Sequence, residues 1–208
     1  MSRIKGSKFA DNLNSRATGD WVQGLKGNDA LGSYVEARLD GGLGDDQISL
    51  YTGKGLALGG GGDDLLFAGE SPALDGAGNA VLNGGRGVDT FMAGFDSTNG
   101  AAQHTVIVGF KSSTSARGQG ERLDLTFSDD GVVLSRVDET GNVIEQATDF
   151  LAALDRDHDG YISAVDGLDA SGVGVTQLNE HMTIHALGGD TVEIRNVSFL
   201  HIGDDIFG

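Results

Sequence analysis

The chain of 208 residues has no cysteine, a single proline (Pro72) and no apolar run that approaches eighteen residues. Without cysteine it forms neither disulfides nor thiolate metal sites. The short apolar runs exclude a transmembrane helix. Residues 1–12 lack the apolar segment of a cleavable signal peptide. The lack of a transmembrane run and of a signal peptide indicates a cytosolic protein, unless export uses another signal.

Basic residues are also scarce, with 14 Lys and Arg against 31 Asp and Glu, for a net charge of −17. No basic face is visible, so a nucleic-acid partner is not expected. The acidic excess opposes folding unless a cation neutralises it. Glycine is abundant, at 35 residues, which is more than twice the usual share of roughly 7% and favours a turn-dense repeat fold.

Three near-identical nine-residue units occupy residues 41–49 (GGLGDDQIS), 59–67 (GGGGDDLLF) and 84–92 (GGRGVDTFM). Each begins Gly-Gly-x-Gly and has aspartate at the sixth place and an apolar residue at the eighth. The glycines allow a tight turn in which main-chain carbonyls point inward beside the aspartate carboxylate. Hard oxygen ligands in a flexible loop favour Ca²⁺. The alternatives are a flexible linker, which would not keep the phase, and a stack of plain polar turns.

The nine-residue phase extends toward the N-terminus. Asp11, Asp20 and Asp29 are nine apart, and residues 24–32 (GLKGNDALG) form an almost complete unit. The turns before Asp11 and Asp20 lack the double glycine, so we expect no full calcium site there. The gap from Asp29 to the next sixth-place aspartate is seventeen, which requires a slip within residues 32–40. The complete turns can share one edge, which predicts one strong and one weak calcium-binding edge.

This nonapeptide resembles the repeats of the repeats-in-toxin (RTX) family. The resemblance implies an all-β fold, a right-handed parallel β-roll over residues 1–96, in which six residues turn, three form a strand and calcium lies between stacked turns. The ligand set that it implies comes from the first, third, fifth and sixth places of four turns: Gly24, Lys26, Asn28 and Asp29; Gly41, Leu43, Asp45 and Asp46; Gly59, Gly61, Asp63 and Asp64; Gly84, Arg86, Val88 and Asp89.

Residues 97–208 are expected to form a C-terminal β capping and secretion region, because an open roll exposes its last rung. Apolar alternation predicts strands at 103–110 and 121–127. It also predicts two hairpins, which pair 132–136 with 142–145 and 182–186 with 191–197.

A second calcium motif lies within residues 148–170. Residues 155–166 (DRDHDGYISAVD) resemble an EF-hand loop, entered by a predicted helix at 148–154. Its candidate ligands are Asp155, Asp157, Asp159, Tyr161 through its carbonyl, Ser163 and Asp166. The last place holds aspartate instead of glutamate, and Gly167 weakens an exiting helix, so we expect a lone structural site. The alternative is a solvated acidic loop.

The chain ends in Asp-Asp-Ile-Phe-Gly. This ending is similar to the uncleaved C-terminal signals of RTX proteins, which implies type I secretion and an extracellular location. His181 and His185 lie in a strand pattern without the zinc-protease motif, which favours packed or exposed histidines over a zinc site.

The leading interpretation is a calcium-binding module that folds in extracellular Ca²⁺ and supports type I secretion, as the C-terminal part of a larger secreted protein. Its expected partners are several calcium ions and the type I secretion apparatus. One alternative is a freestanding extracellular calcium-binding protein of a surface layer or adhesin kind. Another is a secreted hydrolase or epimerase. No nucleophile elbow, zinc-protease motif, P-loop or dinucleotide motif is present, so no catalytic residue is predicted.

Overall fold

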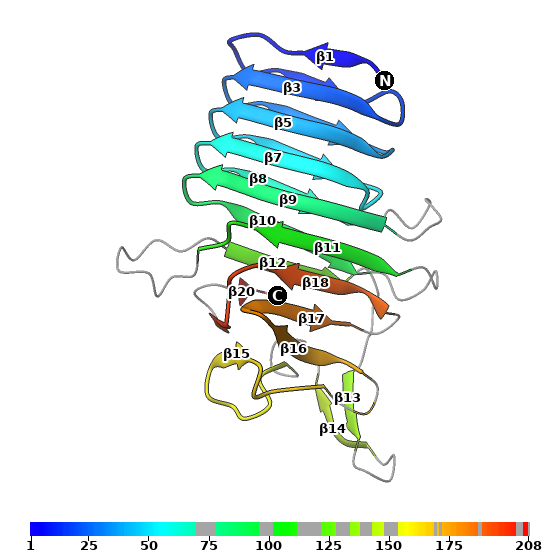
Figure 1. Ribbon diagram of the computed structural model, residues 1–208, viewed down its shortest axis with the longest axis vertical. Coiled ribbons are helices and arrows are strands. Elements are labelled where there is room, and N and C mark those ends of the chain that lie inside the picture. Colours follow the sequence, from blue (N-terminus) through cyan, green and yellow to red (C-terminus); the bar gives the residue numbers. More distant parts are fainter. Residues whose placement is uncertain are drawn as a thin grey trace.

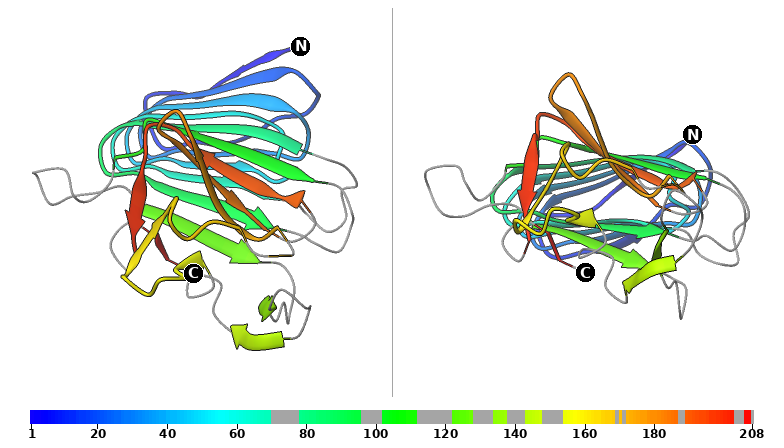
Figure 2. Two further views of the ribbon diagram at one scale, coloured as in Figure 1. Left: turned by 60° about the horizontal axis from the view of Figure 1, so that its bottom comes forward. Right: turned by 90° about the horizontal axis from the view of Figure 1, so that it is seen from below.

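The computed structural model describes residues 1–69, 78–95, 102–111, 122–127, 134–137, 143–147, 154–168, 170, 172–186, 189–202 and 206–207. This part of the chain is nearly all β, with two large sheets that face each other and are mostly parallel (Figures 1 and 2). No helix in this part is long and apolar enough to cross a membrane.

The chain alternates between the two sheets. Two successive strands, one in each sheet, make one coil, and the strands of each coil pair with those of the coil before it. The first sheet contains, in parallel, β1 (Arg3–Lys5), β3 (Asp20–Lys26), β5 (Ala37–Leu43), β7 (Gly55–Gly61), β9 (Gly78–Arg86) and β11 (Gln103–Val108). The second contains β2 (Asn12–Asn14), β4 (Ala30–Ser33), β6 (Gln47–Leu50), β8 (Leu65–Ala68), β10 (Thr90–Phe95) and β12 (Arg122–Phe127).

The pairing register follows the repeat and locates its irregularity. Ser33 pairs with Leu50, an offset of 17 residues. Ala37 pairs with Gly55, an offset of 18. The missing residue therefore lies in the loop at 34–36, which confirms the slip that the sequence predicts within 32–40.

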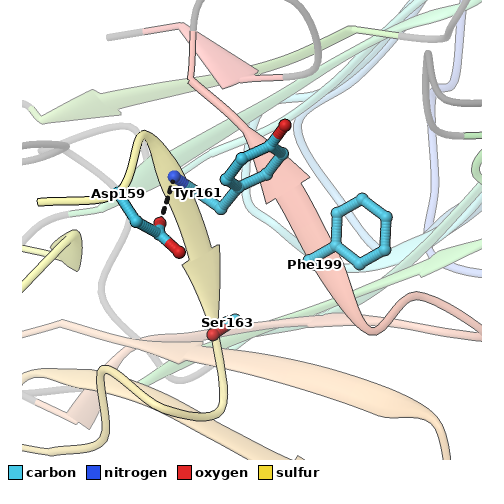
Figure 3. Close-up of a pocket in the computed structure, with 4 residues that line it drawn as sticks. All are labelled: Asp159, Tyr161, Ser163 and Phe199. Atoms are coloured by element: carbon cyan, nitrogen blue, oxygen red, sulfur yellow. Dashed lines mark hydrogen bonds between the residues drawn. The ribbon is translucent and has the colours of Figure 1, made fainter. Parts of the chain in front are cut away.

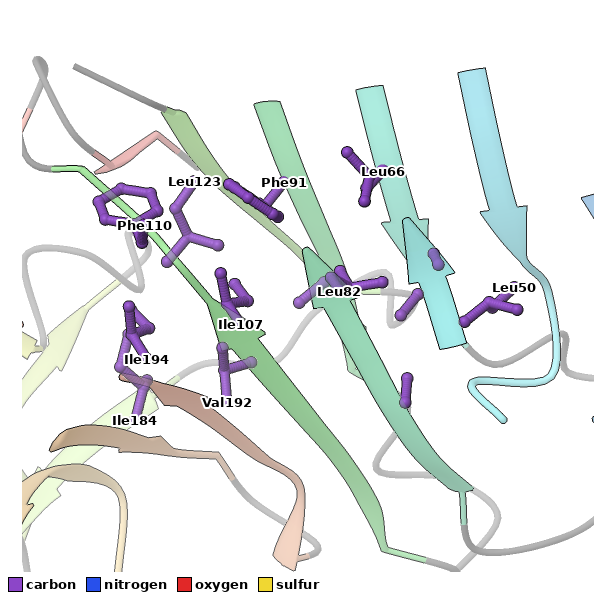
Figure 4. Packing of buried hydrophobic residues seen from close by; sticks show 14 of the residues in the cluster. Leu50, Leu66, Leu82, Phe91, Ile107, Phe110, Leu123, Ile184, Val192 and Ile194 are labelled. Carbon is purple, nitrogen blue, oxygen red and sulfur yellow. The ribbon is translucent and has the colours of Figure 1, made fainter. Parts of the chain in front are cut away.

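The core lies between the sheets because side chains alternate along each strand and every second one is apolar. One ladder crosses the first sheet through Val22, Leu39, Ala57, Leu82 and Ile107, each fully buried. The facing ladder is Leu31, Ile48, Leu66, Phe91 and Leu123, which are at most 3% exposed. Figure 4 shows part of both ladders. The apolar eighth place of the repeat therefore builds the second sheet's half of the core.

The C-terminal strands complete both sheets. β18 (Thr191–Ile194) pairs in parallel with β11, and β17 (His181–His185) and β16 (Gly174–Leu178) follow as antiparallel strands. β20 (Ile206–Phe207) pairs in parallel with β12. Both predicted hairpins are confirmed, since β17 pairs with β18, and β13 (Leu134–Val137) pairs with β14 (Val143–Ala147). The division of the chain at residue 96 stays a prediction.

The expected helix–loop at 148–170 is not seen as such in the described residues. The predicted helix at 148–154 falls outside them, apart from Leu154, which is fully buried in the core. The loop leads directly into β15 (Tyr161–Ser163), which pairs antiparallel with β19 (Phe199–His201). The element is therefore a loop and a two-stranded ribbon, because residues near the chain end supply a partner strand that the local pattern does not reveal.

Candidate metal centres

The four glycine-rich turns stack along one side of the two-sheet structure. Leu25 pairs with Gly42, Gly42 with Gly60 and Gly60 with Gly85, so equivalent places of successive turns lie side by side. We call this side the glycine–aspartate edge and define it by residues 24–29, 41–46, 59–64 and 84–89. The predicted sharing of one edge by the complete turns is confirmed.

Glycine is needed at the second place because the backbone there is left-handed. Gly42, Gly60 and Gly85 have φ values of 112°, 116° and 103°. A Cβ on Gly42 would also overlap the carbonyl oxygen of Leu25 in the preceding coil. Leu25 itself has a φ of 85° at this place, a conformation that is strained for a side chain of this kind.

The sixth-place aspartates join each coil to the one before it. Asp29, Asp46, Asp64 and Asp89 are at most 2% exposed. Their Oδ1 atoms accept the N–H of the aspartate one coil earlier: Asp11 to Asp29 at 2.7 Å, Asp29 to Asp46 and Asp46 to Asp64 at 2.8 Å, and Asp64 to Asp89 at 3.0 Å. One oxygen of each carboxylate is thus a structural acceptor.

The other oxygen of each carboxylate has no such role. The Oδ2 atoms of these four aspartates are buried and have no hydrogen-bond partner in the described part of the chain. A Cβ added to Gly41 would overlap Asp46 Oδ2 and would lie 2.8 Å from the carbonyl oxygen of Gly59. Gly24 and Gly59 repeat this arrangement with their own aspartate and the next coil's carbonyl. A carboxylate oxygen and a carbonyl oxygen therefore approach one small space that only glycine leaves open.

The pKa values of the sixth-place aspartates are raised, as expected for buried carboxylates that lack partners. Burial, opposed by one backbone hydrogen bond and reinforced by neighbouring aspartates, raises the pKa of Asp46 to about 6 and that of Asp64 to about 7. Burial also raises the pKa values of Asp29 and Asp89. Buried carboxylates without a counter-charge are unfavourable in the charged form, so a cation fits this row of oxygens.

The fifth places form a second ladder that runs the opposite way. Asn28 Oδ1 accepts the N–H of Asp45 at 3.1 Å, Asp45 Oδ1 that of Asp63 at 2.9 Å, and Asp63 Oδ1 that of Val88 at 2.8 Å. Here the acceptor lies in the earlier coil, whereas at the sixth place it lies in the later one. The exposed side chains at the fifth place thus link coils.

The third-place carbonyls are also engaged between coils. The carbonyl oxygens of Leu43, Gly61 and Arg86 accept the N–H groups of Gly27, Gly44 and Gly62, respectively, at 2.8 to 2.9 Å. The geometry brings together the first-place carbonyls and the sixth-place carboxylates most directly. A metal role for the third and fifth places, including Lys26, stays a prediction.

The opposite edge, formed by the turns at residues 15–19, 34–36 and 51–54, treats its aspartate differently. Asp20 Oδ1 accepts the Ser2 N–H at 2.9 Å and the Ser2 hydroxyl at 2.8 Å. Its Oδ2 accepts the N–H groups of Arg16 at 3.1 Å and Ala17 at 2.9 Å. These hydrogen bonds, with that from the Ser2 backbone foremost, lower the pKa of Asp20 to about 2. This carboxylate is fully used within the protein.

The second candidate centre is the loop at 155–166. Carboxylate oxygens of Asp155, Asp157 and Asp159 lie within 4.8 Å of one another. Among the described residues, these three form a group that could hold a metal ion. Left-handed backbone at His158 (φ 60°) and Gly160 (φ 85°) bends the chain around them. The three carboxylates predicted from the sequence are therefore brought together.

Asp166 closes this loop. It is 5% exposed, and its two oxygens accept the N–H groups of Arg156 and Ser163, both at 2.7 Å. Partial desolvation and the nearby carboxylates, of which Asp159 contributes most, raise the pKa of Asp157. The loop concentrates negative charge in a conformation held by its own backbone.

The two histidines of β17 make local hydrogen bonds. His181 Nδ1 accepts the N–H of Asn196 at 3.2 Å, and His185 Nε2 lies 2.8 Å from Thr176 Oγ1. Burial, followed by the charge of His104, lowers the pKa of His185. Their role beyond these contacts stays a prediction.

No protein-family model matches the chain, and no curated protein matches it. Among solved structures, the extracellular lipase LipA from Serratia marcescens aligns with 14% sequence identity and a TM-score of 0.32. The alignment covers 99% of this chain and 40% of the lipase chain. A likeness of this size does not define a site, so the chemistry has to follow from the residues themselves.

Proposed function

We propose that the chain is a calcium-binding module of the RTX kind, a right-handed parallel β-roll that folds when extracellular Ca²⁺ fills its glycine–aspartate edge. The observation that carries this proposal is the row of four buried Oδ2 atoms, on Asp29, Asp46, Asp64 and Asp89, that have no partner in the described residues.

Calcium suits this row better than other ions. The groups that approach one another are carboxylate and main-chain carbonyl oxygens, the hard ligands that Ca²⁺ prefers. The turns are glycine-rich, so they can adjust to the longer and more variable bonds of Ca²⁺, whereas Mg²⁺ demands near-ideal octahedral geometry. Ca²⁺ would supply the positive charge that the buried aspartates lack.

Binding would be coupled to folding for the same reason. Without an ion the folded state buries four carboxylates that water hydrates well in the unfolded chain. Extracellular calcium modules typically have Kd values of about 10⁻⁴–10⁻³ M, so the sites would be empty inside a cell and filled outside. Each tenfold excess of Ca²⁺ over Kd adds about 1.4 kcal/mol per site. Several sites together would decide whether the chain is folded.

This coupling would serve export. A chain that is loose at low calcium can pass through a type I secretion apparatus, with residues 204–208 as its signal, and fold outside. The loop at 155–166 would hold a further, structural calcium ion. The proposed role is binding and not catalysis, in the C-terminal part of a larger secreted protein.

The test is far-UV circular dichroism of the purified chain, treated with EGTA and then titrated with CaCl₂, with MgCl₂ as the control. We expect a cooperative gain of β signal near millimolar Ca²⁺ and none with Mg²⁺. A chain already folded in EGTA would contradict the proposal. The variants Asp64→Asn and Asp157→Asn, titrated in parallel, separate the edge from the loop, because only Asp64→Asn should shift the main transition strongly.

A further inference from the structure

The ribbon of β15 and β19 has one buried and one exposed face. Ile162 and Leu200, which are directly paired, are both fully buried in the core. Side chains alternate along a strand, so Tyr161 and Phe199 point away from the core. Tyr161 and Phe199 are 36% and 38% exposed. Two large aromatic side chains are thus held outward by a firmly anchored ribbon.

These rings form two walls of an open pocket. The pocket is lined by Asp159, Tyr161, Ser163 and Phe199 and has a volume of about 350 Å³. The rings of Tyr161 and Phe199 lie 5.8 Å apart at 81°, and the Tyr161 ring also contacts His201 at 4.9 Å. Figure 3 shows the Asp159 carboxylate on one side of the pocket and Phe199 on the other. The pocket therefore combines two aromatic side chains with the polar side chains of Asp159 and Ser163.

We propose that this pocket binds one ring of a neutral carbohydrate. The aromatic faces carry partial negative charge and attract the polarised C–H groups of a sugar ring. Through an oxygen that calcium does not occupy, the Asp159 carboxylate can accept a hydrogen bond from a sugar hydroxyl. The Ser163 hydroxyl, which accepts the Val165 N–H at 3.2 Å, can donate one. Asp159 Oδ1 already accepts the Tyr161 N–H at 2.8 Å, which holds the carboxylate in place.

Charge and size select this ligand class. The pocket adjoins the carboxylates of Asp155, Asp157 and Asp159, whose combined charge exceeds that of one calcium ion and therefore repels anions. An organic cation would compete with the calcium ion proposed for the same loop. Ligand pockets usually span roughly 300–1,000 Å³, so a volume of about 350 Å³ suits a single ring. The inference rests on the proposed function only in that calcium orders the loop carrying Asp159.

Saturation-transfer difference NMR in millimolar CaCl₂ tests the pocket, with methyl α-mannopyranoside, methyl β-glucopyranoside and methyl β-galactopyranoside as probes. We expect transfer to at least one of them. Tyr161→Ala and Phe199→Ala should each weaken binding about tenfold. Phe199→Leu, which keeps an apolar side chain without a ring, should also weaken it. Tyr34→Ala, at a 58% exposed ring on another part of the chain, should leave binding unchanged.

Three results would overturn the inference: no transfer to any pyranoside, equal transfer in the Tyr161→Ala/Phe199→Ala double variant, or transfer only to tetramethylammonium as a fourth probe. Circular dichroism of the same samples separates the two proposals. A chain that folds with calcium but shows no transfer refutes the carbohydrate pocket alone. A chain that is folded in EGTA and still binds a pyranoside refutes calcium-coupled folding alone.

Discussion

The two edges of the β-structure both carry a buried aspartate of the nine-residue repeat, but the two carboxylates differ in their hydrogen-bond partners. Asp20 on the opposite edge and Asp29 on the glycine–aspartate edge are nine residues apart and 1% and 2% exposed. Asp20 has four hydrogen-bond donors, whereas Asp29 Oδ2 has none among the described residues. The contrast shows that burial and periodicity alone do not decide whether both oxygens of an aspartate have hydrogen-bond partners.

The composition of the turn makes the difference. The turn before Asp20 directs the N–H groups of Arg16 and Ala17 toward the carboxylate. The glycine turns instead leave an open space beside Oδ2, with a carbonyl oxygen from the next coil nearby. The first kind of turn supplies hydrogen-bond donors to its own carboxylate, whereas the second leaves one carboxylate oxygen without a partner among the described residues.

The largest expected effect contrasts one glycine from each edge. Gly42→Ala should lower the free energy of unfolding by about 3 kcal/mol or more, because φ is 112° and the new Cβ overlaps the Leu25 carbonyl. Gly19→Ala should cost only about 1–2 kcal/mol, since its φ is 81° but nothing lies within 4 Å. Urea unfolding in saturating CaCl₂ measures both. Equal losses would show that close packing of coils does not restrict the glycine–aspartate edge.

The next effect contrasts two aspartates. Asp64→Asn removes a charge from the row but keeps an acceptor for the Asp46 N–H, so we expect the calcium midpoint to rise more than tenfold. In EGTA the same variant should be no less folded than the unaltered chain. Asp20→Asn should instead destabilise the chain equally with and without calcium, because an amide replaces a carboxylate that accepts four hydrogen bonds. Circular dichroism titrations with calcium measure both variants. Equal calcium midpoints for Asp64→Asn and Asp20→Asn would contradict the proposed difference between the two edges.

The two edges should also respond oppositely to pH. The raised pKa values of Asp46 (about 6) and Asp64 (about 7) mean that the ion-free folded chain holds protons which the unfolded chain releases near its ordinary value of 3.8. This contribution is fully present below the unfolded pKa and is lost as pH rises through 6 to 7. The Asp20 contribution is present above 3.8 and is lost as pH falls through about 2.

In EGTA the chain should therefore be more structured near pH 5 than near pH 8. With calcium, protons compete for the same oxygens, so the calcium midpoint should rise by up to about tenfold from pH 8 to pH 6. Circular dichroism at constant ionic strength measures both trends. A calcium midpoint independent of pH over this range would contradict the assignment of Asp46 and Asp64 as ligands.

The smallest effect concerns the exposed fifth-place ladder. Asp45→Ala removes the acceptor of the Asp63 N–H and should cost about 0.5–1.5 kcal/mol. Asp45→Asn keeps the acceptor and should be nearly neutral, as Asn28 occupies the equivalent place one coil earlier. Urea unfolding in calcium compares the two. A strong rise of the calcium midpoint in Asp45→Asn would instead make the side chain a ligand.

The sequence predicts the periodic part of the fold well, because glycine, aspartate and the apolar eighth residue each act within one turn or strand. The stacking of the four turns, the slip now located at 34–36 and the convergence of Asp155, Asp157 and Asp159 all follow from local spacing.

The parts that depend on distant partners were not predictable in this way. β15 gains its partner β19 from residues about forty positions later, and three-residue strands carry too little alternation to be recognised. The exposed pair of Tyr161 and Phe199 is therefore not predictable from the sequence, because Phe199 and Leu200 are adjacent apolar residues without alternation. The role of Asp20 also depends on Ser2, eighteen residues away.

The sixth-place ladder has a polarity with a consequence for assembly. The N–H groups of Asp11, Asp29, Asp46 and Asp64 each have their acceptor in the coil that follows in the chain. The sixth-place N–H of a turn therefore gains its hydrogen bond only when the next coil has folded against it. A chain shortened after residue 83 would lose Asp89, and with it the acceptor for Asp64, so damage at the end of the row would begin by loosening a turn that the deletion never touched.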